Sequence, residues 1–231
     1  MPIKVIAFDA DDTLWVNEPF FREAEEKFTS LLEDFMPQHG IMKELYRTEI
    51  ENLTLYGYGI KGFMLSMIET ALRITDHKMP ITLVDKIIRI GHEMLEKPVE
   101  LLPGVEEVLK ALNGDYRMVL ATKGDLVDQE RKLQKSGLEQ YFHHIEIMSE
   151  KRVGDYQKLI RHLDVQPNEF LMLGNSLKSD ILPVLELGGH GIHIPFHITW
   201  LHEQIKHEVE HERFYKVENI AEAAELIQKI G

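Results

Sequence analysis

Short apolar runs alternate with helix-like segments from residue 103 onward, and this alternation constrains the fold more than any other feature. Strand-like runs lie at residues 116–122, 143–149, 169–174 and 190–195, and amphipathic segments of about helical spacing separate them. Strands that alternate with helices form a parallel sheet whose two faces are covered by the helices. We therefore predict an α/β fold with a Rossmann-like parallel sheet core, to which the apolar run Ile3–Phe8 adds a further strand.

The stretch between the first strand and residue 100 has a different pattern. Apolar residues recur there at spacings of three and four, as in EPFFREAEEKFTSLLEDFM, KGFMLSMIETALRI and LVDKIIRIGHEMLEK, and a glycine-rich loop, YGYGIKG, interrupts them. This pattern predicts a small all-helical domain at residues 17–99. The sheet core is then predicted to comprise residues 1–16 and 100–231.

Polar residues follow four of the predicted strands at the point where each strand ends. Asp9 follows the first strand, Thr122 ends VLAT, Lys151 comes shortly after IEIM, and Asn175 follows FLMLG. The carboxyl ends of parallel strands meet at one edge of a sheet, which is where ligands bind in such folds. The sequence therefore predicts one site built from these residues.

These motifs resemble those of the haloacid dehalogenase-like superfamily, most of whose members are phosphatases. FDADDTL is similar to the first motif, the run ending at Thr122 to the second, Lys151 to the third and GNSLKSD to the fourth. The resemblance covers nearly the whole chain, and the helical insert lies where one class of these proteins carries a cap domain. It implies a phosphomonoester hydrolase that acts on a small phosphorylated metabolite.

The resemblance also implies roles for individual residues. Asp9 would be the nucleophile that forms an aspartyl-phosphate, and Asp11 the general acid and base. Thr122 and Lys151 would hold the phosphoryl oxygens. The expected cofactor is Mg²⁺, a cation that prefers oxygen ligands, and the implied metal-binding residues are Asp9, Asp11 through its backbone carbonyl, Asn175 and Asp180. The candidate substrate-binding residues are Thr122, Lys123, Lys151, Tyr58 and Lys61.

Three positions depart from the family pattern or leave a choice open. The fourth motif usually has an acidic residue where this chain has Asn175; we expect its amide oxygen to be the inner ligand, with Asp180 in support. Asp12 replaces a common glycine and is compatible with a tight turn. Lys158 lies seven residues after Lys151, but we expect it to be solvated within a helix.

Two further segments allow a functional and a structural interpretation. Tyr58 and Lys61 could reach the substrate, or their loop could be a helix-to-helix turn that uses glycine for its backbone freedom. The segment HITWLHEQIKHEVEHERF, residues 197–214, carries four histidines. We predict exposed positions on an acidic, solvated helix there rather than a second metal site.

Composition excludes several classes of function. The formal net charge of -13 argues against non-specific binding to nucleic acid or to anionic membranes. The absence of cysteine excludes disulfides and thiolate chemistry. No uncharged apolar run reaches the length of a membrane span, so we expect a cytoplasmic protein.

Other functions remain in competition. A haloacid dehalogenase needs the nucleophile but generally lacks the second carboxylate, so Asp11 argues against it. A phosphomutase uses the same core and differs only in the phosphoryl acceptor. A signalling receiver domain is about half as long and carries its phosphorylated aspartate after the third strand. A catalytically silent binding protein is the last alternative, and the retained motif residues argue against it.

Overall fold

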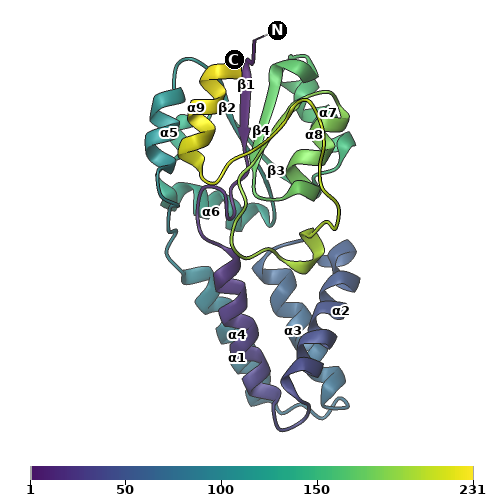
Figure 1. Cartoon of the computed structure of the whole chain (residues 1–231). Helices are drawn as coiled ribbons and strands as arrows, with labels where there is room; N and C mark the ends of the chain where they lie inside the picture. The colour runs from purple at the N-terminus through teal and green to yellow at the C-terminus, as the bar shows by residue number, and fades with distance from the viewer. Residues whose placement is uncertain (1, 231) are drawn as a thin grey trace. The chain divides into compact units, whose positions relative to one another are not determined.

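The computed structural model describes residues 2–230, which divide into two compact units. Within these residues, the first unit comprises 2–18, Val99–Lys123 and 129–230, and the second comprises Pro19–Pro98 and Gly124–Asp128. The first contains the sheet, and the second is helical (Figure 1).

A six-stranded sheet forms the centre of the first unit. Its strand order is β3-β2-β1-β4-β5-β6, and all neighbouring strands pair in parallel. The strands are β1 (Val5–Phe8), β2 (Arg117–Lys123), β3 (His144–Met148), β4 (Phe170–Gly174), β5 (His190–His193) and β6 (Phe214–Lys216). The predicted parallel α/β core is thus confirmed, and β1 lies at its centre between β2 and β4.

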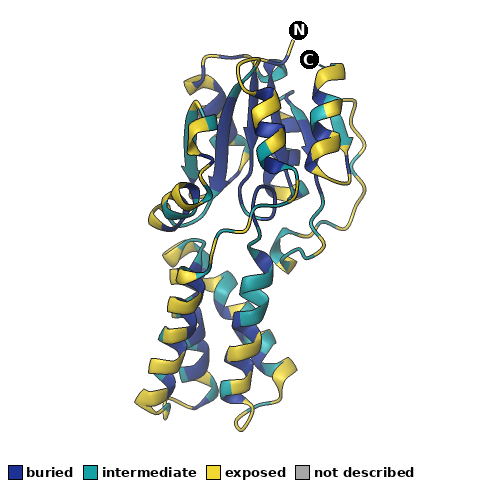
Figure 2. Ribbon diagram, turned by 90° about the vertical axis from the view of Figure 1, so that its left-hand side faces the viewer, coloured by how far each residue is buried: buried dark blue, intermediate teal, exposed yellow. Residues whose placement is uncertain are grey.

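Alternate side chains of the central strands enter two separate apolar clusters. Ile6 and Phe8 of β1 pack with residues of α5 (Val105–Leu112), α6 (Leu126–Ser136) and α9 (Ile220–Ile230). Val5 and Ala7 pack on the opposite face with residues of α7 (Val153–His162) and α8 (Leu182–Glu186). The sheet is therefore covered on both faces, and its central strands are buried along their length (Figure 2).

Several short turns complete the first unit. Three are 3₁₀ helices, η1 (Glu139–Tyr141), η2 (Pro167–Glu169) and η4 (Leu201–Glu203), and η3 (Leu177–Ile181) is a π-helical turn. The predicted helix at residues 197–214 is wrong. Within that range the chain forms only η4 and the first residue of β6, and it is otherwise irregular.

The helices of the second unit are α1 (Glu18–Leu32), α2 (Gln38–Tyr56), α3 (Ile60–Ile74) and α4 (Ile81–Glu96). Their apolar faces form a separate core in which Phe28, Leu45, Met67 and Ile87 are almost completely buried. The first residue of α1 belongs to the sheet unit by the division above. The burial of one face of each helix explains the spacing of three and four in the sequence.

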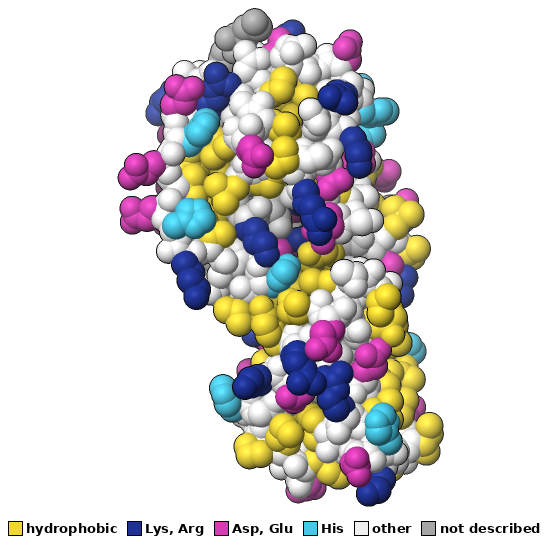
Figure 3. Space-filling view, turned by 90° about the vertical axis from the view of Figure 1, so that its right-hand side faces the viewer, with side chains coloured by type: hydrophobic (Ala, Val, Ile, Leu, Met, Phe, Trp, Pro, Cys, Tyr) yellow, Lys and Arg dark blue, Asp and Glu magenta, His cyan; other side chains and the backbone are white. Residues whose placement is uncertain are grey.

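Charged side chains of both signs are interspersed on the face of the molecule in Figure 3. Among the helices within residues 2–230, none combines the length and the apolar character needed to cross a bilayer.

Candidate active site

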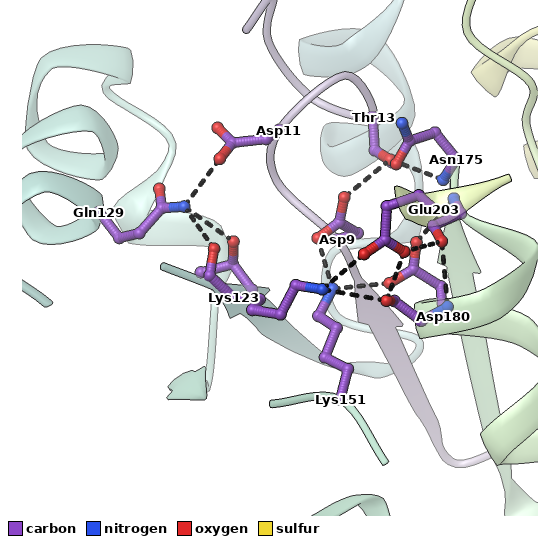
Figure 4. Close-up of polar contacts among 12 residues, drawn as sticks. Asp9, Asp11, Thr13, Lys123, Gln129, Lys151, Asn175, Asp180 and Glu203 are labelled. Carbon is purple, nitrogen blue, oxygen red and sulfur yellow. Dashed lines mark hydrogen bonds and ion pairs between the residues drawn. The ribbon is translucent and has the colours of Figure 1, made fainter. Parts of the chain in front are cut away.

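The predicted site residues of the sheet unit lie at the carboxyl ends of its strands (Figure 4). Asp9 directly follows β1, Thr122 is the penultimate residue of β2, and Asn175 directly follows β4. Lys151 comes three residues after the end of β3. The central position of β1 places Asp9 between the ends of β2 and β4.

Lys151 joins two carboxylates that are far apart in the sequence. Its Nζ lies 2.5 Å from Asp9 Oδ1 and 2.6 Å from Asp180 Oδ1. The Thr13 hydroxyl donates to Asp9 Oδ2 at 3.2 Å. All four residues are buried, and the side chain of Lys151 is only 2% exposed. When both carboxylates are ionised, this buried group of two carboxylates and one ammonium has one excess negative charge.

The pKa values of the group reflect that excess. Burial and the neighbouring Asp180 carboxylate raise the pKa of Asp9 to about 7, against the opposing effect of Lys151. Burial alone would lower the pKa of Lys151, but Asp180 and Asp9 raise it well above its usual value. Lys151 therefore remains a cation at neutral pH.

The turn after β4 brings Asp180 to the site. A Cβ on Gly174 would overlap the Asp180 carboxylate, so this close approach requires glycine. Ser176 N–H donates to Asp180 Oδ2 at 2.9 Å. The backbone of Asn175 is fixed on both sides, because its N–H donates to Thr13 Oγ1 at 3.1 Å and its carbonyl lies 3.0 Å from His193 Nε2.

The Asp11 side chain lies apart from the Asp9 group, and its carboxylate is turned toward α6 (Figure 4). Gln129 Nε2 donates to Asp11 Oδ2 at 2.8 Å. Lys132 Nζ lies 2.6 Å from Asp11 Oδ1, which also accepts from Trp15 Nε1 at 2.8 Å. Both carboxylate oxygens are therefore hydrogen-bonded in this conformation.

Asp12 has the structural role that its position suggested. Its backbone adopts a φ of 60°, in the left-handed region that glycine favours. Its carboxylate accepts from the backbone N–H groups of Asn17 and Glu18 at 2.8 and 3.0 Å. Burial raises the pKa of Asp12 to about 8.

Thr122 and Lys123 contact other parts of the same edge. The buried Thr122 Oγ1 accepts from Gln129 Nε2 at 3.2 Å, so Gln129 links Thr122 to Asp11. Lys123 Nζ lies 2.8 Å from Glu203 Oε1 and 3.1 Å from Ser179 Oγ. These contacts do not test whether Thr122 and Lys123 bind substrate, so both roles stay predictions.

The remaining candidates are Lys158 of the sheet unit and two residues of the helical unit. Lys158 is exposed on α7, where it pairs with Asp155 at 3.4 Å, as expected of a solvated helical lysine. Tyr58 and Lys61 belong to the helical unit, in which Lys61 Nζ lies 2.9 Å from Asp125 Oδ1. Their substrate contacts also stay predictions.

The polar residues of the site that were not predicted include Gln129, Lys132 and Glu203. Gln129 and Lys132 are three residues apart on α6 and both bond to Asp11. Their spacing in a helix that follows a site strand was the available signal. No comparable spacing pointed to Glu203, and its segment was predicted to be a solvated helix.

The donors near Asp9 fit a hard divalent cation. The candidates are all oxygens: the carboxylates of Asp9 and Asp180, the Asn175 amide oxygen and the Asp11 carbonyl. Within residues 2–230, the Asn175 side-chain amide makes no hydrogen bond. No group of three or more His, Asp or Glu side chains within the same range is arranged around a common metal position. The site suits a divalent cation because the buried group has excess negative charge and because carboxylate, amide and carbonyl oxygens lie near it.

Comparisons with known proteins agree with this arrangement. A solved haloacid dehalogenase-like hydrolase from Xanthomonas campestris is 37% identical, covers 99% of this chain and 91% of its own, and superposes with a TM-score of 0.88. The pyrimidine 5'-nucleotidase YjjG of Escherichia coli is 24% identical over 79% of this chain and 82% of its own. A glyceraldehyde 3-phosphate phosphatase of Pyrococcus furiosus is 26% identical over 80% of this chain and 78% of its own.

The model of the haloacid dehalogenase-like hydrolases matches residues 3–188, which include all four motifs. The match, the fold and the buried Asp9–Lys151–Asp180 group together identify the chain. It belongs to the haloacid dehalogenase-like hydrolase family.

Proposed function

We propose that this protein is a Mg²⁺-dependent phosphomonoester hydrolase that acts on a small phosphorylated metabolite through an aspartyl-phosphate at Asp9. The observation that carries the proposal is the contact of Asp9 with Lys151 at 2.5 Å, beside Asp180 and at the end of the central strand. A second carboxylate, Asp11, follows two residues later. Nucleophile, cation and candidate acid thus come from the same edge of one sheet.

By this proposal the metal would be held by Asp9, Asp180, the Asn175 amide oxygen and the Asp11 carbonyl. When bound, Mg²⁺ supplies positive charge that offsets the repulsion between the carboxylates and an anionic phosphoester. Lys151 would bind a phosphoryl oxygen while it keeps Asp9 oriented. Its buried position favours this role, because charge interactions are stronger where water is excluded.

The chemistry assigned to the side chains has two steps. In the first, an Asp9 oxygen bonds to phosphorus, the ester P–O bond breaks, and Asp11 donates a proton to the leaving oxygen. In the second, water bonds to phosphorus, Asp11 accepts a proton from it, and the Asp9–phosphorus bond breaks to release inorganic phosphate. Acid–base assistance of this kind contributes about 10²- to 10⁴-fold.

Asp11 must leave its present hydrogen bonds to act as this acid. Its oxygens are bound to Trp15, Gln129 and Lys132, and Figure 4 shows the carboxylate turned toward Gln129. We propose that the carboxylate rotates toward the leaving group once substrate binds. The helical unit would then act as the cap that selects the substrate, with Tyr58 and Lys61 as candidate contacts.

The related proteins support the phosphoester class. Two of them are named for phosphoester hydrolysis, one as a nucleotidase and one as a phosphatase. A dehalogenase is the main rival within the family, and Asp11 argues against it because halide displacement needs no second carboxylate. A phosphomutase and a silent binding protein remain the alternatives.

The test is hydrolysis of a chromogenic aryl phosphate with added Mg²⁺, without it and with chelator, followed by a panel of phosphorylated metabolites. We expect Mg²⁺-dependent release of inorganic phosphate. Phosphoryl transfer to a sugar phosphate without phosphate release would indicate a mutase. Halide release from 2-haloacids without metal would indicate a dehalogenase, and no reaction with any of these would favour a binding protein.

A further inference from the structure

Glu203 reaches the site from a segment outside the four motifs. It ends the short turn η4, in the irregular stretch between β5 and β6, and its side chain is only 13% exposed. Its Oε1 lies 2.8 Å from Lys123 Nζ. Its Oε2 accepts from the hydroxyls of Ser176 and Ser179, each at 2.6 Å. Both oxygens of this mostly buried carboxylate therefore contact hydrogen-bonding side chains, three in all.

Each of these partners is next in sequence to a predicted site residue. Lys123 follows Thr122, Ser176 follows Asn175, and Ser179 precedes Asp180. Glu203 therefore connects the end of β2 to both ends of the turn that carries the candidate metal ligands. Figure 4 shows its carboxylate on the same side as Asp180 and Lys151.

The charge of Glu203 and the charges of the Asp9 group act on a common neighbour, the Tyr156 hydroxyl. Lys123 and the two serine hydroxyls lower the pKa of Glu203 to about 2, against the opposing effect of burial, so it is an anion at neutral pH. The pKa of the buried Tyr156 hydroxyl is raised well above its usual value, chiefly by burial, and four charged side chains act on it: Lys151, Asp180, Asp9 and Glu203. With Lys123 included, the cluster has three carboxylates and two ammonium groups.

We propose that Glu203 is a positioning residue that fixes the Lys123 ammonium and the Ser176–Ser179 turn, and that its charge limits the affinity of the site for phosphoryl anions. This inference rests on the proposed function, because it concerns the same phosphoryl site. An ammonium paired with a carboxylate attracts an anion less than a free ammonium does. Glu203 would thus allow Lys123 to assist phosphoryl binding without retaining the phosphate product.

The charge-removing variant Glu203→Gln separates this role from a purely structural one. Its amide oxygen can still accept from the serines, but the negative charge 2.8 Å from Lys123 Nζ is removed. We expect Glu203→Gln to bind inorganic phosphate about 3- to 30-fold more tightly than the wild type. Its kcat should fall about 3- to 30-fold, because Lys123 and the turn are held less firmly. A residue that only stabilised the fold would not tighten phosphate binding.

The experiment is calorimetric titration of inorganic phosphate in the presence of Mg²⁺. Lys123→Met, which leaves Glu203 uncompensated, should bind phosphate about 3- to 30-fold more weakly. The double variant Lys123→Met/Glu203→Gln should return close to wild-type affinity. Glu208→Gln, an exposed glutamate of the same segment, is the matched control with the same change of net charge.

The outcomes separate the two proposals. If the wild type binds phosphate and Glu203→Gln binds it equally or more weakly, the inference is overturned while the proposed function stands. If the wild type neither binds phosphate nor hydrolyses an ester, both fail. If Glu203→Gln does not fold, phosphate binding is compared between Lys123→Met and Lys123→Arg. Weaker phosphate binding in Lys123→Met alone supports the inference, and unchanged binding in both variants contradicts it.

Discussion

Lys151 Nζ lies 2.5 Å from Asp9 Oδ1, although the two residues are 142 positions apart in the chain. The contact forms because β1 and β3 run parallel in one sheet and their carboxyl ends reach the same edge. It gives a buried carboxylate a fixed orientation and a permanent cation beside it. The proposed nucleophile is therefore oriented before any substrate arrives.

Replacement of Asp9 tests the nucleophile. Asp9→Asn keeps the size of the side chain but removes the attacking oxygen charge, and we expect kcat to fall by about 10³-fold or more. Phosphate release from an aryl phosphate measures the loss. Asp115→Asn, at an exposed position of the same unit, should retain wild-type turnover. Equal activity in Asp9→Asn and the wild type would rule out Asp9 as the nucleophile.

Replacement of Lys132 tests the hydrogen bonds that hold Asp11. Lys132→Met removes an ammonium 2.6 Å from Asp11 Oδ1, where both side chains are mostly buried. We expect the free energy of unfolding to fall by about 1–3 kcal/mol, because a poorly solvated carboxylate loses its cation. Urea unfolding measures this, with the exposed Lys135→Met on the same helix as the control. An equal effect of both substitutions would contradict the role of the pair.

Asn175 allows a test of the metal site by gain of function. Asn175→Asp restores the acidic residue usual in the family and adds a charge beside Asp9 and Asp180. The half-saturating concentration of Mg²⁺ should fall about 3- to 10-fold, measured by thermal unfolding during a Mg²⁺ titration. Without metal the variant should be less stable than the wild type, since the added carboxylate repels its neighbours. Unchanged Mg²⁺ affinity would place Asn175 outside the ligand set, and the exposed Asn113→Asp controls for net charge.

Glu203 predicts an acid-dependent contribution to stability. Its pKa is lowered from 4.5 to about 2 in the folded protein, so the unfolded chain binds more protons between these values. The stabilisation is complete above pH 4.5 and disappears as the pH falls toward 2. At neutral pH it amounts to at most about 3 kcal/mol. In urea unfolding, the difference between the wild type and Glu203→Gln should shrink as the pH is lowered through this window; a difference independent of pH would contradict the shift.

The sequence contained enough information to predict the sheet core and the approach of Asp9, Thr122, Lys151 and Asn175 to one edge of it. Apolar runs of strand length mark five of the six strands, and parallel pairing then brings residues after the strand ends together. The three-residue strand β6 was missed because it is too short to show a pattern. The preceding segment was read as a helix because its charged and histidine residues are spaced as on a solvated helical face.

Other features of the site depend on tertiary contacts that leave no local pattern. Glu203 bonds to Lys123, Ser176 and Ser179, which lie 80, 27 and 24 positions away. The rotamer of Asp11 is stabilised by hydrogen bonds from Gln129 and Lys132. The directions of these two side chains depend on how α6 packs. Motif spacing identifies which residues approach the strand ends, but it does not specify their hydrogen-bond partners.

The central claim, that Asp9 accepts the phosphoryl group, is tested most directly in an Asp11→Asn variant, which should form the phosphorylated enzyme faster than it hydrolyses it. The variant is mixed with a phosphoester and Mg²⁺, quenched in acid and digested, and the peptide containing Asp9 is analysed by mass spectrometry. The account predicts that this peptide gains the mass of one phosphoryl group, and that the gain is absent when Asp9 is also replaced by Asn. An unmodified Asp9 peptide during measurable ester hydrolysis would contradict it.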